Sequence, residues 1–192
     1  MYKIGLTGGI GSGKTYIAEI FNRLSIPVFN SDIEGKKCMQ EHDSVRQRII
    51  DVFGKEVYSN KKLNSDKLAE IVFNNHILLE SLNAIIHPVV LDKFNTWILQ
   101  QDSDIVIKES AILFESGTNK ELDKIICVCA SEETRIQRII DRDGLTKEEV
   151  LSRIKSQMSQ AKKEKLSDFV IQNSGVELLL PQILHILELI KN

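Results

Sequence analysis

Residues 2–15 read YKIGLTGGIGSGKT, and this stretch decides the fold. Its first half is a short apolar run that is typical of a buried strand, and residues 8–15 match the phosphate-loop pattern G-x-x-x-x-G-K-[ST] in full. Glycines permit positive φ, so successive backbone N–H groups can point into one concavity. From Lys14 onward the apolar residues recur at helical spacing, and a helix start adds its positive dipole end. The stretch therefore predicts a site for the polyphosphate of a nucleoside triphosphate, with Mg²⁺.

The loop also indicates what its polar residues do. Lys14 would reach the β- and γ-phosphates, and Thr15 would place its hydroxyl group on Mg²⁺. The loop alone does not separate kinases, GTPases and ATPase motors. A GTPase needs the guanine-reading pattern N-K-x-D, and its nearest counterpart, residues 119–122, lacks the final Asp. Residues 51–54 match D-x-x-G but fall in a helical pattern, so we interpret them as coincidence and favour a small kinase.

The rest of the chain predicts a parallel sheet with a helical insertion. Strand, turn, helix and strand within about 30 residues form a βαβ unit. Residues 33–101 show helical periods and no strand-like run, so we expect four or five helices there, two of them meeting at His87-Pro88. Residues 132–165 hold 16 charged residues in 34 and should form solvent-facing helices, and a last helix should run from 176 to 190. Further strand-like runs occupy residues 27–29, 105–107, 124–129 and 169–171.

These patterns predict an α/β fold of the P-loop NTPase class, with three αβα layers and a parallel sheet of about five strands. We expect a nucleotide-binding core from residues 1–32, 102–134 and 166–192. Residues 33–101 would form a helical substrate-binding insertion, and residues 135–165 a helical lid.

Composition excludes several classes of partner. The 192 residues carry 25 Lys plus Arg and 27 Asp plus Glu, a net charge of −2, which does not favour nucleic acid. No apolar run approaches the ~20 residues of a membrane span, and residues 1–5 are too short for a signal peptide, so we expect a cytoplasmic protein. Cys38, Cys127 and Cys129 fit neither zinc nor disulfide spacing and should be buried, the last two on one strand face. We expect a monomer or small homo-oligomer.

Two acids follow predicted strands at their carboxyl ends, where doubly wound sheets bind ligands. Asp32 could take a proton from an acceptor hydroxyl or act as a Mg²⁺-shell ligand, and it could also cap the helix that begins near Ile33. Glu109 is similar to the acid that closes a Walker B strand and holds Mg²⁺ through water, although a solvated strand-end acid is an equal alternative.

Other polar residues allow both a functional and a structural interpretation. Arg135, Arg138 and Arg142 share a helical face. Beside a phosphate loop the row suits charge on a transferred phosphoryl group, and we favour Arg138 or Arg142; the alternative is a solvated face paired with neighbouring acids. His87 could bind a substrate or be structural. Asn173 could read the adenine edge or cap a helix.

Taken together, these residues resemble the dephospho-coenzyme A kinase family over nearly the whole chain. The family transfers the γ-phosphoryl group of ATP to the 3′-hydroxyl of dephospho-CoA, so the resemblance implies ATP, Mg²⁺ and dephospho-CoA as ligands. It also implies a P-loop core, a helical substrate domain and a helical lid. The ordered series that carries the resemblance comprises residues 5–14, the Asp32 region, residues 82–83 with 87–88, residues 112–115, residues 138–143, Gln157, and residues 168–171 with Asn173.

The resemblance implies roles for individual residues. Asp32 would be the general base, Arg138 and Arg142 would be lid arginines, and Asn173 would lie in the adenine pocket. His87 and Gln157, with Asp32, would bind the acceptor, and Thr15 and Glu109 would hold the metal. Lys14 would be both catalytic and ATP-binding. The other expected ATP-binding residues are Gly9, Gly11, Ser12, Gly13, Thr15 and Tyr16.

The chain departs from the family pattern in three places. Asn30 replaces the first acid of an Asp-x-Asp pair whose second acid is Asp32. Ala111 replaces the proline of Pro-Leu-Leu-Phe-Glu, and Glu109 stands where an Asp is common. Ser65 appears near the place of a substrate-domain arginine, with Lys61, Lys62 and Lys67 close by.

Two other functions fit the same residues. One is a different small-molecule kinase of the nucleoside-monophosphate-kinase type, which the insertion and the lid arginines allow. The other is a non-enzymatic ATP sensor, against which the presence of Lys14, Thr15 and Asp32 argues. A panel of acceptors would separate these alternatives.

Overall fold

The computed structural model describes residues 1–60, 62–73 and 75–191. The chain divides into two compact units. Unit 1 comprises Met1–Phe29 and Gln101–Asn192, and unit 2 comprises Asn30–Gln100. Residues 135–165 belong to unit 1. Their function as a lid stays a prediction.

A five-stranded sheet of order β2-β5-β1-β6-β7 forms the main sheet. β1 is parallel to both of its neighbours, pairing Leu6 with Glu109 of β5 and Thr7 with Cys127 of β6. β6 is in turn parallel to β7. The predicted parallel sheet of about five strands is confirmed. Its strands are β1 (Tyr2–Thr7), β2 (Val28–Asn30), β5 (Ile105–Glu109), β6 (Lys124–Cys129) and β7 (Phe169–Gln172).

Successive residues of a strand face opposite sides of the sheet, and in unit 1 helices cover both sides. α1 (Lys14–Arg23) and α9 (Leu179–Lys191) contribute to one buried apolar cluster with Ile4 and Leu6 of β1. Gly5, between those two residues, faces the other way, where a Cβ would lie 2.6 Å from the Leu113 side chain. On that second face lies α8 (Gln160–Leu166), which contacts β6.

Two expectations about the helices of unit 1 need correction. The last helix begins at Leu179 rather than Val176, which is 88% exposed in a turn of irregular backbone. The charged stretch does form helices, namely α6 (Glu132–Asp143), α7 (Lys147–Lys155) and α8. It is not wholly solvent-facing, however, because Arg135 and Lys163 are 5% and 0% exposed. Long basic side chains on an amphipathic helix can turn inward where a polar partner exists.

Unit 2 contains helices and one hairpin, whose two strands have two residues each. The sequence did not predict this hairpin. The hairpin packs on α2, because Tyr58 donates its hydroxyl hydrogen to the Met39 carbonyl at 2.7 Å. Strands this short leave no apolar period to detect. The elements of unit 2 are α2 (Ser31–Glu41), α3 (Asp43–Phe53), a 3₁₀ turn (Lys55–Val57), β3 (Tyr58–Ser59), β4 (Lys62–Leu63), α4 (Ser65–Phe73) and α5 (His76–Ile98).

The expected helix break at His87-Pro88 is wrong, since α5 runs through both residues. A proline inside a helix removes one backbone hydrogen bond, yet here the helix continues. Ile86 and Val90 lie on either side of Pro88 and are 8% and 6% exposed, so core packing on both sides holds the helix together.

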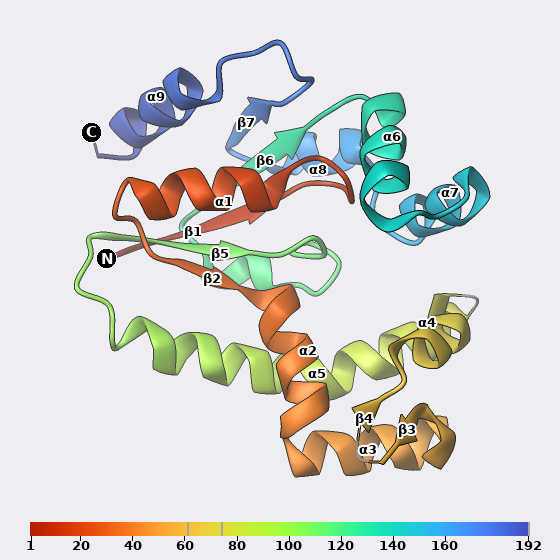
Figure 1. Cartoon of the computed structure of the whole chain (residues 1–192). Coiled ribbons are helices and arrows are strands. Elements are labelled where there is room, and N and C mark those ends of the chain that lie inside the picture. Colours follow the sequence, from red (N-terminus) through yellow and green to blue (C-terminus); the bar gives the residue numbers. More distant parts are fainter. Residues whose placement is uncertain (61, 74, 192) are drawn as a thin grey trace. The chain divides into compact units, whose positions relative to one another are not determined.

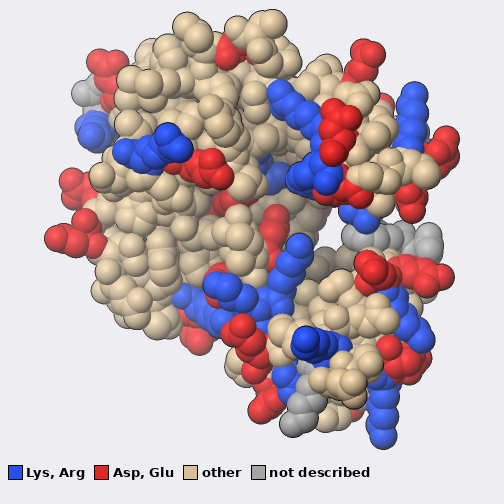
Figure 2. All heavy atoms as spheres, viewed as in Figure 1, with Lys and Arg blue, Asp and Glu red and all other residues tan. Residues whose placement is uncertain are grey.

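Charged side chains of both signs lie beside one another over α6 and α7, and likewise over the helices of unit 2 (Figure 2). This mixed surface matches the net charge of −2. In the part of the chain that the structure describes, no helix is both long enough and apolar enough to traverse a bilayer.

Candidate active site

The phosphate loop joins β1 to α1 and lies beside α6 (Figure 1). Gly11 and Gly13 have φ of 80° and 93°, in the left-handed region that favours glycine. A Cβ on Gly13 would lie 2.2 Å from Asn173 Nδ2, and one on Gly11 would lie 2.6 Å from the Arg135 carbonyl oxygen. Both positions therefore require glycine for conformation and for space.

Lys14 is the first residue of α1 and is 8% exposed. Its Nζ donates to the carbonyl oxygens of Gly8 at 3.1 Å and Gly9 at 3.4 Å, which holds the ammonium group against the loop. The residue before it, Gly13, has no side chain to cap the helix. A positive ammonium and an uncapped helix N-terminus favour an anion at the same place.

Thr15, in the first turn of α1, and Glu109, at the end of β5, contact each other. The Thr15 hydroxyl donates to Glu109 Oε1 at 3.3 Å. Glu109 ends β5 and is 2% exposed, so the interpretation as a solvated strand-end acid is wrong. A hydroxyl and a carboxylate are the hard oxygen ligands that Mg²⁺ prefers, and the pair fits this cation.

Asn173 and Arg138 hold the other side of the loop through Ser12. Asn173 Nδ2 donates to the Ser12 carbonyl at 2.9 Å, and Arg138 Nη1 donates to the same oxygen at 3.5 Å. Asn173 follows β7 and is 8% exposed, whereas α9 begins at Leu179, so its interpretation as a helix cap is wrong. The structure thus brings Asn173 and Arg138 together with the loop.

The three arginines of α6 lie in three different environments. Arg142 is 63% exposed and forms two hydrogen bonds with Asp143, which raise the pKa of the guanidinium. Arg135 is 5% exposed, and burial lowers the pKa of its guanidinium. Among the residues that the structure describes, none accepts a hydrogen bond from its Nε, and its Nη2 lies 4.0 Å from Glu132 Oε2. Of the predicted pair, Arg138 contacts the loop, whereas Arg142 pairs with an acid.

Two glutamines bind the first amides of the loop. Gln157 Oε1 accepts from the Ile10 N–H at 3.0 Å, and Gln160 Oε1 accepts from the Gly9 N–H at 2.9 Å. The sequence analysis selected Gln157 for the acceptor and missed Gln160. No local sequence pattern marks Gln160, because its partners Gly9 and Cys129 lie 151 and 31 residues away.

An ion pair between a buried lysine and a partly exposed glutamate anchors the segment that carries these glutamines. Lys163 is fully buried, and its Nζ contacts Glu115 Oε1 at 2.8 Å and donates to the Ala111 carbonyl. Glu115 Oε1 also accepts from the Met158 N–H at 2.8 Å. The segment 157–163 is therefore tied to the loop after β5 as well as to the phosphate loop.

The residues predicted for the acceptor lie in unit 2, apart from Gln157, which lies in unit 1. Asp32 is exposed in the first turn of α2, whose N-cap is Asn30: the Asn30 side chain accepts from the Ile33 N–H at 2.8 Å. The helix thus begins two residues earlier than expected, and the interpretation of Asp32 as its cap is wrong. His87 is half-buried on α5, and Ser65 begins α4. The position of these residues relative to the phosphate loop stays a prediction, and Lys61 lies outside the described residues.

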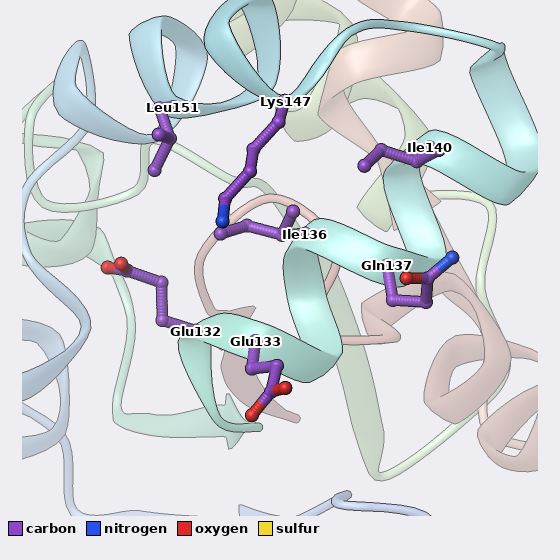
Figure 3. A pocket seen from close by; sticks show the side chains of 7 residues that line it. All are labelled: Glu132, Glu133, Ile136, Gln137, Ile140, Lys147 and Leu151. Atoms are coloured by element: carbon purple, nitrogen blue, oxygen red, sulfur yellow. The ribbon is translucent and has the colours of Figure 1, made fainter.

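A separate pocket of about 570 Å³ lies between α6 and α7. Lys147 and Leu151 project from α7 toward Ile136 on α6, and Glu132 lies at the edge (Figure 3). Residues of the phosphate loop do not line this pocket. We therefore do not assign it to the candidate active site.

Solved structures with the same fold include a dephospho-CoA kinase and a shikimate kinase. A Thermus thermophilus protein, TT1252, is 29% identical with a TM-score of 0.88, and the match covers 100% of this chain and 98% of that one. The dephospho-CoA kinase of Campylobacter jejuni is 27% identical with a TM-score of 0.65, over 98% and 95% of the two chains. Shikimate kinase from Acinetobacter baumannii, 14% identical with a TM-score of 0.57 over 99% and 93%, shares the fold.

Sequence comparisons agree. The dephospho-CoA kinase of Bacteroides fragilis strain YCH46 is 41% identical over 186 residues, which are 96% of this chain and 91% of that protein. The dephospho-CoA kinase of Porphyromonas gingivalis is 39% identical over 192 residues, 100% of this chain and 95% of that protein. The sequence model of the dephospho-CoA kinase family matches residues 2–177. The chain therefore belongs to the dephospho-CoA kinase family.

Proposed function

We propose that this chain transfers the γ-phosphoryl group of ATP to the 3′-hydroxyl of dephospho-CoA and releases CoA and ADP. The observation that carries the proposal is the Thr15–Glu109 contact beside Lys14, at the carboxyl ends of two adjacent parallel strands. These groups supply a metal-binding oxygen pair and a cation where the triphosphate of a P-loop kinase lies. Membership in the family supplies the acceptor.

The nucleotide side of the mechanism uses residues of unit 1. The amides of residues 11–16 and the Lys14 ammonium group would hold the triphosphate. Thr15 and Glu109 would hold Mg²⁺, which neutralises charge on the β- and γ-phosphate oxygens when it is bound. Asn173, fixed on Ser12, would contact the adenine.

The acceptor side would use Asp32 and His87 of unit 2, together with Gln157 and the α6 arginines of unit 1. Asp32 would take the proton of the 3′-hydroxyl as that oxygen bonds to the γ-phosphorus. The bond from the γ-phosphorus to the β–γ bridging oxygen then breaks, and ADP leaves. Arg138 and Arg142 would stabilise charge on the transferred group, and His87 would bind the acceptor. Gln157, whose Oε1 is engaged by Ile10, would offer its side-chain NH₂ group to the substrate.

A coupled assay of ADP release from Mg·ATP tests this function. We expect stimulation by dephospho-CoA, with CoA appearing in step with ADP, and none by AMP, UMP or shikimate. Stimulation by one of those acceptors instead would support a P-loop kinase but contradict dephospho-CoA as its acceptor. ATP binding without transfer to any acceptor would favour the sensor.

A further inference from the structure

The phosphate loop uses its backbone amides in two groups. The amides of residues 11–16 are those that we assign to the triphosphate. The amides of Gly9 and Ile10 donate instead to protein oxygens, at 2.9 Å to Gln160 Oε1 and 3.0 Å to Gln157 Oε1. The loop is thus held at its start by side chains. Among the amides that we assign to the triphosphate, that of Ser12 donates to the Gly9 carbonyl oxygen at 3.1 Å within the loop.

The amide group of Gln160 has a defined orientation. Its Nε2 donates to Cys129 Sγ at 2.8 Å, and the Cys127 Sγ and Val128 carbonyl oxygen lie 3.4 Å away. All three are acceptors at the end of β6, so they face the NH₂ side of the amide and leave Oε1 for Gly9. The hydrogen bond from Cys129 to Cys127 and burial raise the pKa of the Cys129 thiol, so this sulfur stays neutral at physiological pH.

The surroundings of Gly9 leave the loop little freedom. A Cβ on Gly9 would lie 2.3 Å from Arg135 Nη1 and 3.0 Å from Gln160 Oε1, so both side chains touch this glycine. The backbone segment that carries Gln160 is itself held in place, because Lys163 and Glu115 connect it to the loop after β5. The contact chain therefore runs from the end of β6 through Gln160 to the start of the phosphate loop.

We infer that Gln160 is a positioning residue for the phosphate loop and that it acts through the Gly9 N–H. A glycine-rich loop that is not held must be ordered when the nucleotide binds, and that ordering lowers affinity. Gln160 removes this cost in advance by fixing Gly9 to β6. The inference rests on the proposed function only in taking ATP as the ligand.

ATP binding measured by titration calorimetry without any acceptor tests the inference. Gln160→Met keeps the length of the side chain and removes both hydrogen-bonding groups. We expect the Kd for ATP to rise about fivefold to tenfold, in line with the loss of one buried hydrogen bond. The matched control is Gln137→Met on α6, an exposed glutamine that bonds Asp141 at 2.7 Å, and its Kd should equal that of the parent.

A second measurement separates positioning from mere stability. With saturating ATP, kcat of Gln160→Met should stay within about threefold of the parent, because the residue does not contact the reacting atoms. Cys129→Ser, which keeps an acceptor for Nε2, should bind ATP more tightly than Cys129→Ala. Gln160→Asn, one methylene shorter, tests the same contact if Gln160→Met does not fold.

The outcomes distinguish this inference from the proposed function. An unchanged Kd for ATP in folded Gln160→Met or Gln160→Asn overturns the positioning role, even if dephospho-CoA is phosphorylated normally. A melting temperature that falls while the Kd stays constant does the same, since it shows a structural role only. If the parent binds ATP but does not phosphorylate dephospho-CoA, a raised Kd in the variant still supports positioning while the proposed function fails.

Discussion

The two units hold their candidate residues in different ways. In unit 1, Lys14, Glu109 and Asn173 are each no more than 8% exposed, and each is hydrogen-bonded to another part of the site. In unit 2, Asp32 is exposed and His87 is half-buried. The residues proposed for the nucleotide are held together by hydrogen bonds within unit 1, whereas Asp32 and His87, which we propose for the acceptor, lie on helices of unit 2.

Burial explains this difference. A buried ammonium or carboxylate is costly unless it has a partner, so Lys14 and Glu109 must be held by neighbours in the folded chain. An exposed carboxylate such as Asp32 has no such requirement. Variants of unit 1 should therefore disturb nucleotide binding and stability together, and variants of unit 2 should affect turnover or acceptor binding alone.

The largest effect that we expect comes from Asp32→Asn. If Asp32 is the general base, kcat should fall by about 10²–10⁴-fold, because the amide cannot accept the proton. The Kd for ATP, measured by calorimetry, should stay unchanged, since unit 1 is intact. Asp51→Asn on α3, an exposed aspartate that accepts from Gln47 at 2.8 Å, is the matched control and should turn over like the parent. Normal turnover by Asp32→Asn would remove this residue from the chemistry.

Glu109→Gln tests the proposed metal-binding role of Glu109 in unit 1. The amide keeps the shape of the carboxylate and can still bond the Thr15 hydroxyl, but it carries no charge for a cation. We expect kcat to fall about tenfold to a hundredfold and the Mg²⁺ concentration for half-maximal activity to rise. A Mg²⁺ titration of activity at fixed ATP measures this, and an unchanged Mg²⁺ requirement would contradict the metal assignment.

The arginines of α6 provide a comparison within unit 1. Arg138 donates to the Ser12 carbonyl of the loop, whereas Arg142 pairs with Asp143 in solvent. Arg138→Ala should therefore lower kcat/KM for ATP about tenfold or more, and Arg142→Ala should lower it less. Steady-state kinetics of the two variants under identical conditions decide the order. A larger effect of Arg142→Ala would mean that it leaves Asp143 during catalysis.

The strands and the loop could be predicted because their signals are local. Glycines, Lys14 and the apolar run before them specify a strand, a turn and a helix within 15 residues, and the sheet follows from similar short runs. Glu109 and Asn173 could be selected because one ends a strand and the other follows one, both at the carboxyl end of the strand. Burial of Arg135 and Lys163 was missed, because a charged helix predicts a solvated face unless a distant partner such as Glu115 is known.

The uninterrupted course of α5 and the N-terminal cap of α2 also could not be predicted from local sequence. Pro88 predicts a helix boundary locally, yet packing on both sides carries α5 through it. Asn30 caps α2, and Asp32 lies inside the helix, a shift of two residues that periodicity does not resolve. Gln160 escaped notice because its partners, Gly9 and Cys129, lie 151 and 31 residues away in sequence.

The smallest expected effect concerns the link between α2, which carries Asp32, and α5, which carries His87. Glu34 pairs with Lys37 at 2.7 Å and with Lys93 of α5 at 3.2 Å. Its hydrogen bond with Lys37, and then that with Lys93, lower the pKa of the Glu34 carboxyl below its usual 4.5. A lowered folded-state pKa contributes stability above pH 4.5 and loses it as pH falls through the lowered value.

A double-mutant cycle of Glu34→Gln and Lys93→Gln, followed by urea unfolding, measures this link. We expect a coupling of about 0.5 kcal/mol at pH 7, as for partly exposed ion pairs, and a smaller one at pH 3. The KM for dephospho-CoA should rise slightly in Glu34→Gln while the Kd for ATP stays constant, because only unit 2 is loosened. A coupling independent of pH would show that packing, rather than charge, joins the two helices. A raised Kd for ATP in Glu34→Gln would contradict this expectation, because it would show that a change in unit 2 alters nucleotide binding in unit 1.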